Sequence, residues 1–192
     1  MSMNRIASSI TSWPAWQAFL FTCIPFFGAG YVAMPEPGQP GSVVEMEVMF
    51  SRMMLTLIPV AIVLYSWIWS IGNVANRAAS DGATRPDRFF NFALPYTFAY
   101  LVFAYFFFPS PGKMENPPVP IGLVMILHVF AVVCTFYAVA SAAMRLKSFE
   151  AGDRVGFGGS FSTFFLIWFF PLGVWFVQPR ANKASAALAT AN

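Results

Sequence analysis

The chain has 192 residues, of which 58% are hydrophobic, 18% are aromatic and only 10% are charged. A soluble domain carries about 25% charged residues, so this composition excludes an ordinary globular protein and indicates a membrane protein with several spans. The net charge of +3 is small, and the chain contains no run of basic residues that would predict binding to nucleic acid.

Four apolar runs follow one another along the chain, and each is long enough for a membrane helix, which needs about 20 residues. The first run, residues 16–33, begins beside tryptophans of the kind that mark a membrane interface. After a segment rich in proline and glycine, we expect the second helix over residues 42–76. The third span is predicted over residues 89–108 and the fourth over residues 121–144, which hold no charged side chain.

A fifth apolar run, residues 161–177, is short and contains a proline and a glycine near its middle. If this run crossed the membrane, Arg180 and Lys183 would lie outside the cell, against the usual charge rule. A re-entrant segment satisfies that rule, and a fifth span is the alternative. The predicted fold class is therefore all-α, a polytopic membrane helix bundle of four transmembrane helices plus a C-terminal re-entrant or fifth hydrophobic segment. Residues 1–180 would form one transmembrane domain and residues 181–192 a flexible polar tail.

Positive charges are concentrated in two of the connecting segments. Residues 77–88 and 145–160 each hold three Lys or Arg, whereas residues 34–51 hold none and residues 109–120 hold one. Cytoplasmic loops carry the excess of Lys and Arg in membrane proteins. The two basic segments and the N-terminus are therefore predicted to be cytoplasmic.

The end of the chain carries a recognisable segment. Residues 164–180 read FFLIWFFPLGVWFVQPR and are followed by Asn182 and Lys183. This segment resembles the C-terminal signature of a group of uncharacterised small bacterial integral membrane proteins. The resemblance implies a multi-pass protein of the bacterial inner membrane, and it implies no activity and no functional residues.

Two of the predicted helices carry polar faces. Ser66, Ser70 and Asn73 recur at helical steps on the second helix, and His128 and Thr135 share a face of the fourth. One interpretation is a polar path or a ligand site between these helices. The interpretation that we favour is a helix–helix seam, where small and hydroxyl residues allow close approach and interhelical hydrogen bonds. In the predicted topology these two helices are parallel neighbours.

His128 is the only histidine of the chain and would lie within the membrane, where an ionisable residue is by default a candidate functional residue. It could serve as an axial ligand to haem or to a pigment. The chain has no second imidazole to complete such a site, however. A neutral histidine that is hydrogen-bonded to a neighbouring helix is the simpler expectation, so no cofactor is predicted.

Charged residues near the outer start of the second helix are candidates for contact with a partner. Glu45, Glu47 and Arg52 could meet the charges of another subunit, or the acids could pair with Arg52 and hold it at the membrane edge. A solvated entry of the helix into the membrane is the simpler account of the same residues.

The sequence offers no recognisable catalytic chemistry. It has no catalytic set of Ser, His and Asp, no metal-ligand spacing and no pair of carboxylates inside a span. We therefore expect a non-catalytic protein and not an enzyme, serving as an accessory, scaffold or assembly subunit of a larger bacterial membrane complex. It would contact membrane lipids and either other integral membrane subunits or further copies of itself. The alternative is a small transporter or a membrane protein that binds a lipophilic ligand or cofactor.

Overall fold

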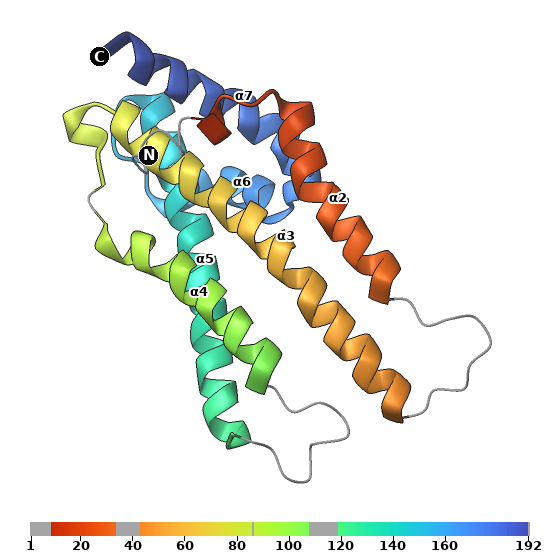
Figure 1. The fold of residues 1–192 in the computed structure, drawn as a ribbon. Coiled ribbons are helices and arrows are strands. Elements are labelled where there is room, and N and C mark those ends of the chain that lie inside the picture. The colour runs from red at the N-terminus through yellow and green to blue at the C-terminus, as the bar shows by residue number, and fades with distance from the viewer. Residues whose placement is uncertain (1–8, 34–42, 86, 108–118, 192) are drawn as a thin grey trace.

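The computed structural model describes residues 9–33, 43–85, 87–107 and 119–191, and in these ranges it contains helices and no strand. Its α-helices are α2 (Ala15–Ala33), α3 (Val43–Ala78), α4 (Arg88–Phe107), α5 (Ile121–Ala151), α6 (Phe157–Trp168) and α7 (Phe170–Ala191), with the short 3-10 helix η1 (Asp81–Ala83) between α3 and α4 (Figure 1). The all-helical fold class is therefore confirmed.

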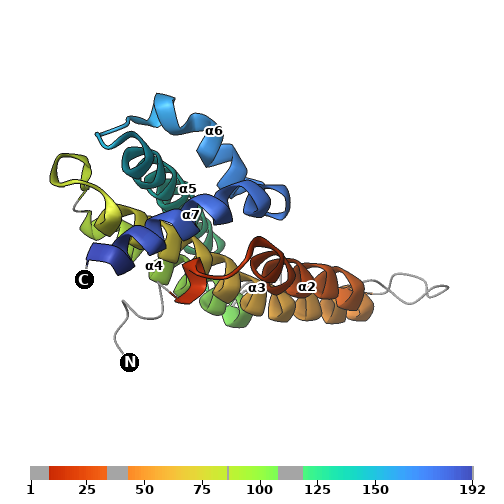
Figure 2. The ribbon, with the colours of Figure 1, turned by 90° about the horizontal axis from the view of Figure 1, so that it is seen from above.

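Two antiparallel helix pairs, α2 with α3 and α4 with α5, form the body of the molecule (Figure 1). The helices α3 and α5 run in the same direction and pack against each other, as the sequence predicted. At one end, here called the closed end, α3 and α5 terminate, α4 begins, and α6 and α7 lie across the bundle (Figure 2). Toward the opposite end, here called the open end, the two pairs diverge (Figure 1).

Three helices of the described ranges are long and apolar enough to cross a membrane. They comprise Val48–Ala78, Arg88–Phe107 and Ile121–Ala151, and they correspond to the second, third and fourth predicted spans. The first predicted span is α2, a helix of 19 residues with several side chains outside the described part of the structure. The helix α6 has only 12 residues and is too short to cross alone.

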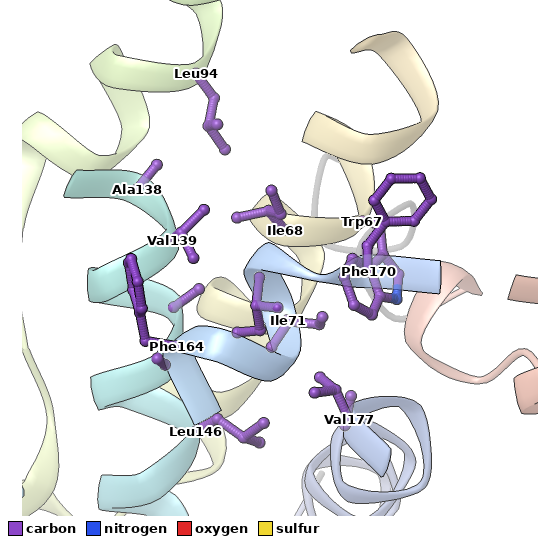
Figure 3. Close-up of a cluster of buried hydrophobic side chains, with 14 of the residues drawn as sticks. Trp67, Ile68, Ile71, Leu94, Ala138, Val139, Leu146, Phe164, Phe170 and Val177 are labelled. Carbon is purple, nitrogen blue, oxygen red and sulfur yellow. The ribbon is translucent and has the colours of Figure 1, made fainter. Parts of the chain in front are cut away.

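The core lies at the closed end, where α3 and α5 meet. Ile68 and Ile71 of α3 lie in one buried cluster with Ala138 and Ala142 of α5, and α6 and α7 complete the cluster. These bulky apolar side chains share the buried part of α3 with Ser70 of the predicted polar face, which is also fully buried. Figure 3 shows the wider cluster, which includes Ile68, Leu94, Val139, Leu146, Phe164, Phe170 and Val177.

The helices α6 and α7 are joined by a sharp break in the last apolar run. Pro171 lies in the first turn of α7, a position that tolerates proline. A Cβ atom on Gly173 would overlap the backbone carbonyl of Leu166 in α6, so only glycine permits this close approach. The start of α6 and the end of α7 both lie at the closed end. Arg154, just before α6, bonds to Thr84, and the last part of α7 packs near Val74.

Residues 181–191 differ from the flexible polar tail that we expected. They continue α7 to Ala191, and Ala181 and Ala184 are buried. Alanine is the strongest helix former and needs little space, so an alanine-rich segment can pack closely on Val74 and Phe149.

Candidate functional site

The closed end contains a polar cluster centred on Asp87, which is the N-terminal cap of α4. Its Oδ1 accepts the backbone N–H groups of Phe89 at 3.0 Å and Phe90 at 3.2 Å. Its Oδ2 accepts the hydroxyl of Tyr137 at 2.5 Å and that of Ser141 at 3.1 Å. One carboxylate therefore starts α4 and joins it to α5.

Arg145 of α5 is the buried cation of this cluster, with only 3% of its side chain exposed. Its Nη2 lies 3.9 Å from Oδ2 of Asp87 and donates to the carbonyl oxygen of Arg85 at 3.2 Å. Its guanidinium carbon lies 4.1 Å from the centre of the Phe90 ring, a cation–π contact. A buried cation requires such partners, because its transfer from water is costly.

Two further arginines connect the segment before α4 with the segment before α6. Arg85 donates its backbone N–H to Asn76 at 2.6 Å and its Nη2 to the carbonyl of Val155 at 2.7 Å. Arg154 donates its Nη2 to the carbonyl of Thr84 at 3.2 Å. Each segment therefore contributes an arginine side chain that bonds to the backbone of the other.

These groups surround a cavity of about 360 Å³, which we call the arginine cavity. Within the described residues, the buried Nε atoms of Arg85 and Arg145 have no hydrogen-bond partner. The lining residues are Arg85, Asp87, Tyr137, Ser141, Met144, Arg145 and Arg154.

Asp87 is ionised in this environment. Its burial opposes ionisation, but the hydrogen bonds from Tyr137, Phe90 and Ser141 and the charge of Arg145 outweigh burial and lower its pKa. The cavity is therefore lined by three cations and one anion at neutral pH.

A second polar group, built around Gln178 of α7, fixes the start of the described chain. Its Oε1 accepts the indole N–H of Trp67 at 2.7 Å. Its Nε2 lies within hydrogen-bond distance of the carbonyls of Ile10, Thr11 and Trp13, at 3.0–3.3 Å, and of the Asn182 side chain. Gln178 is fully buried, so these contacts satisfy a polar side chain that would otherwise be costly to bury.

Arg180 provides a similar connection two residues further along α7. It pairs with Glu150 of α5 and donates to Thr163 of α6 at 3.0 Å. Glu150 also pairs with Lys147 at 3.0 Å. Gln178 and Arg180 thus hold α7 to α3, α5 and α6 through specific side chains.

A more apolar cavity of about 450 Å³ lies between α3 and α4 and is here called the α3–α4 cavity. Its volume lies within the range of small-molecule sites. The residues that line it are Ile10, Ala61, Ile62, Tyr65, Ser66, Trp69, Asn91, Leu94, Pro95 and Phe98.

The structure does not gather the predicted ligand residues of α3 into one site. Only Ser66 lines the α3–α4 cavity. The hydroxyl of Ser70 donates to the carbonyl of Ser66 at 2.7 Å, and the amide of Asn73 donates to the carbonyl of Trp69 at 3.0 Å. Both side chains therefore bond to the backbone of their own helix.

Of the two predicted residues of α5, His128 contacts α4, whereas Thr135 contacts α4 and also bonds to the side chain of Tyr65 of α3. Nδ1 of His128 lies 3.0 Å from the hydroxyl of Tyr100, a hydrogen bond to the neighbouring helix α4. Thr135 donates to the carbonyl of Ala131 at 3.0 Å and lies 3.5 Å from the hydroxyl of Thr97. Within the described residues no group of three His, Cys, Asp or Glu side chains could hold a metal ion.

The predicted partner contacts lie at the open end. Arg52 is exposed on α3. The side chains of Glu45 and Glu47 lie outside the described residues, so their pairing with Arg52 stays a prediction.

Sequence reasoning missed the arginine cavity. Two signals were present: Asp87 precedes an apolar run, as an N-cap does, and Arg145 directly follows a long uncharged run. Neither signal shows that Asp87 and Arg145 are partners, because 58 positions separate them in the sequence.

Comparison with known proteins found no family model, no curated protein and no solved structure that matches this chain.

Proposed function

We propose that this protein is a non-catalytic accessory, scaffold or assembly subunit of a larger complex in a bacterial inner membrane. The observation that carries the proposal is an apolar face on α6 and α7 that the other described residues leave uncovered. The large exposed side chains of this face are Phe161, Phe165, Phe169, Leu172, Trp175 and Phe176.

The opposite face of α6 and α7 is well packed. Its side chains Ile167, Val174 and Val177 are buried. In the proposed topology α2, α3, α4 and α5 span the membrane, and α6 and α7 enter from the cytoplasmic side and return to it. A re-entrant break must be covered by protein, which favours another integral membrane subunit on the exposed face.

Purification in a mild detergent, followed by mass spectrometry of the intact fraction, tests the proposal. The unmodified chain should carry a partner protein at fixed stoichiometry. A double variant of the exposed face, Leu172→Ala with Phe176→Ala, should lose that partner without a change in its own unfolding temperature.

The matched control is Ile126→Ala with Val129→Ala, two equally exposed apolar residues of α5 at the open end. It should keep the partner. A single-copy particle without stoichiometric protein, or equal loss of the partner in both double variants, would overturn the proposal.

The α3–α4 cavity favours a second candidate, a protein that binds a lipophilic ligand. Ser66, a predicted ligand residue, lies in its lining with the polar side chains of Tyr65 and Asn91. If this candidate is right, a lipophilic molecule should copurify with the unmodified chain and be lost from Ala61→Phe, which fills the cavity. Extraction and mass spectrometry of the bound small molecules would measure the difference.

A further inference from the structure

The arginine cavity carries more positive charge than its own residues neutralise. Three guanidinium groups, those of Arg85, Arg145 and Arg154, face a single carboxylate in the lining, that of Asp87. The lining therefore holds two uncompensated positive charges.

Asp87 has little remaining capacity to accept these cations. Its two oxygens already accept two backbone N–H groups and the hydroxyls of Tyr137 and Ser141. Its distance to Arg145 is 3.9 Å, which is an ion pair but too long for a hydrogen bond. The carboxylate thus organises the cavity and leaves its arginines free to meet another anion.

The arginines also have unused donors. A guanidinium carries five N–H groups, and the side chains of Arg85 and Arg145 each donate once to a backbone carbonyl. Their Nε atoms are buried and have no partner among the described residues. Because a buried donor normally has a partner, these two donors indicate that an acceptor occupies the cavity.

Size and position favour a phosphate group as that acceptor. The cavity of about 360 Å³ has the volume of roughly ten water molecules. A guanidinium group binds phosphate through two parallel hydrogen bonds to two of its oxygens. Asp87 immediately precedes the span Arg88–Phe107, so the cavity lies at the depth of lipid headgroups, where basic pockets between membrane helices bind phosphate.

We propose that the arginine cavity binds a phosphate group, carried either by an anionic phospholipid or by a small soluble phosphate. This proposal is independent of the scaffold function, because it concerns a different face of the molecule.

The test is the thermal unfolding of the intact chain, purified in a neutral detergent and freed of lipid. Phosphatidylglycerol should raise the unfolding temperature where phosphatidylcholine does not, if the source is a lipid. Inorganic phosphate should raise it above chloride at equal ionic strength, if the source is soluble. If neither addition raises the temperature, the proposal fails.

Arg154→Gln makes the test specific, because Arg154 is exposed and its side chain joins the fold through a hydrogen bond to the carbonyl of Thr84. It should weaken binding of the effective ligand about tenfold. Arg88→Gln is the matched control, since Arg88 is an exposed cation beside Asp87 that does not line the cavity. Equal weakening in both variants would show general charge attraction and overturn the proposal.

Discussion

The closed and open ends of the bundle are built from the same helices but are held together in different ways. At the closed end, buried polar side chains such as Asp87, Arg145 and Gln178 connect elements that lie far apart in the sequence. At the open end, large apolar side chains face outward, with Ile126 and Phe106 exposed to 68% and 67%. Apart from the apolar face of α6 and α7, the closed end is therefore held by contacts within the chain, whereas these side chains of the open end face the surroundings.

This difference follows from the solvent. In lipid, apolar side chains gain little by packing on one another, and specific helix contacts depend on close fit and hydrogen bonds. The closed end has a close fit where Gly173 meets the backbone of Leu166, and it has hydrogen bonds in its polar clusters. We therefore expect substitutions at the closed end to cost far more stability than substitutions of equal size at the open end.

The largest effect is expected from Asp87→Ala. It removes the cap of α4 and leaves Arg145 buried without its counter-ion, which typically costs about 3–5 kcal/mol. Unfolding in a titration with denaturing detergent, followed by circular dichroism, measures the loss. Asp81→Ala removes an exposed acid of η1 and is the control, with an expected change within about 0.5 kcal/mol. Similar losses in both variants would mean that the Asp87 cluster does not stabilise the closed end.

The next largest effect is expected from Gly173→Ala. The added methyl group would overlap the carbonyl of Leu166, and such overpacking costs about 1–3 kcal/mol. Gly158→Ala in α6 is the matched control, because nothing lies within 4 Å of its added Cβ. The same detergent titration should separate the two variants, and a fully stable Gly173→Ala chain would contradict the close approach of α6 and α7.

The sequence predicted the long apolar helices, because the hydropathy and length of an apolar run can be read from consecutive residues. It did not predict the closed end, because the contacts there join distant positions, such as Asp87 with Tyr137 and Gln178 with Ile10. The polar face of Ser70 and Asn73 was a weak guide for a related reason. Periodicity shows that polar residues share a face, but it does not show that their hydrogen bonds return to their own helix.

A smaller effect, dependent on pH, should come from the charge of Asp87. Its pKa is lowered in the folded chain from an ordinary value of 3.8, so its ionisation stabilises the fold above that pH. The stabilisation is lost as the pH falls below 3.8 through the folded pKa. The stability gap between the unmodified chain and Asp87→Asn should therefore be constant from pH 7 to about 5 and close in stronger acid. If this stability difference widened in acid, the pKa of Asp87 would be raised in the folded chain, contrary to the prediction.

The smallest effect is expected at the open end, from His128→Leu. His128 bonds to the hydroxyl of Tyr100, and hydrogen bonds between membrane helices contribute about 0.6 kcal/mol on average. Tyr100→Phe should cost the same amount, and the double variant should cost no more than either single one, because both remove one bond. A loss of several kcal/mol for His128→Leu alone would contradict the contribution of a single hydrogen bond, and the disappearance of a visible absorbance band would identify His128 as a cofactor ligand. The open end would then hold a site of its own, and the contrast between the two ends would no longer be one of packing alone.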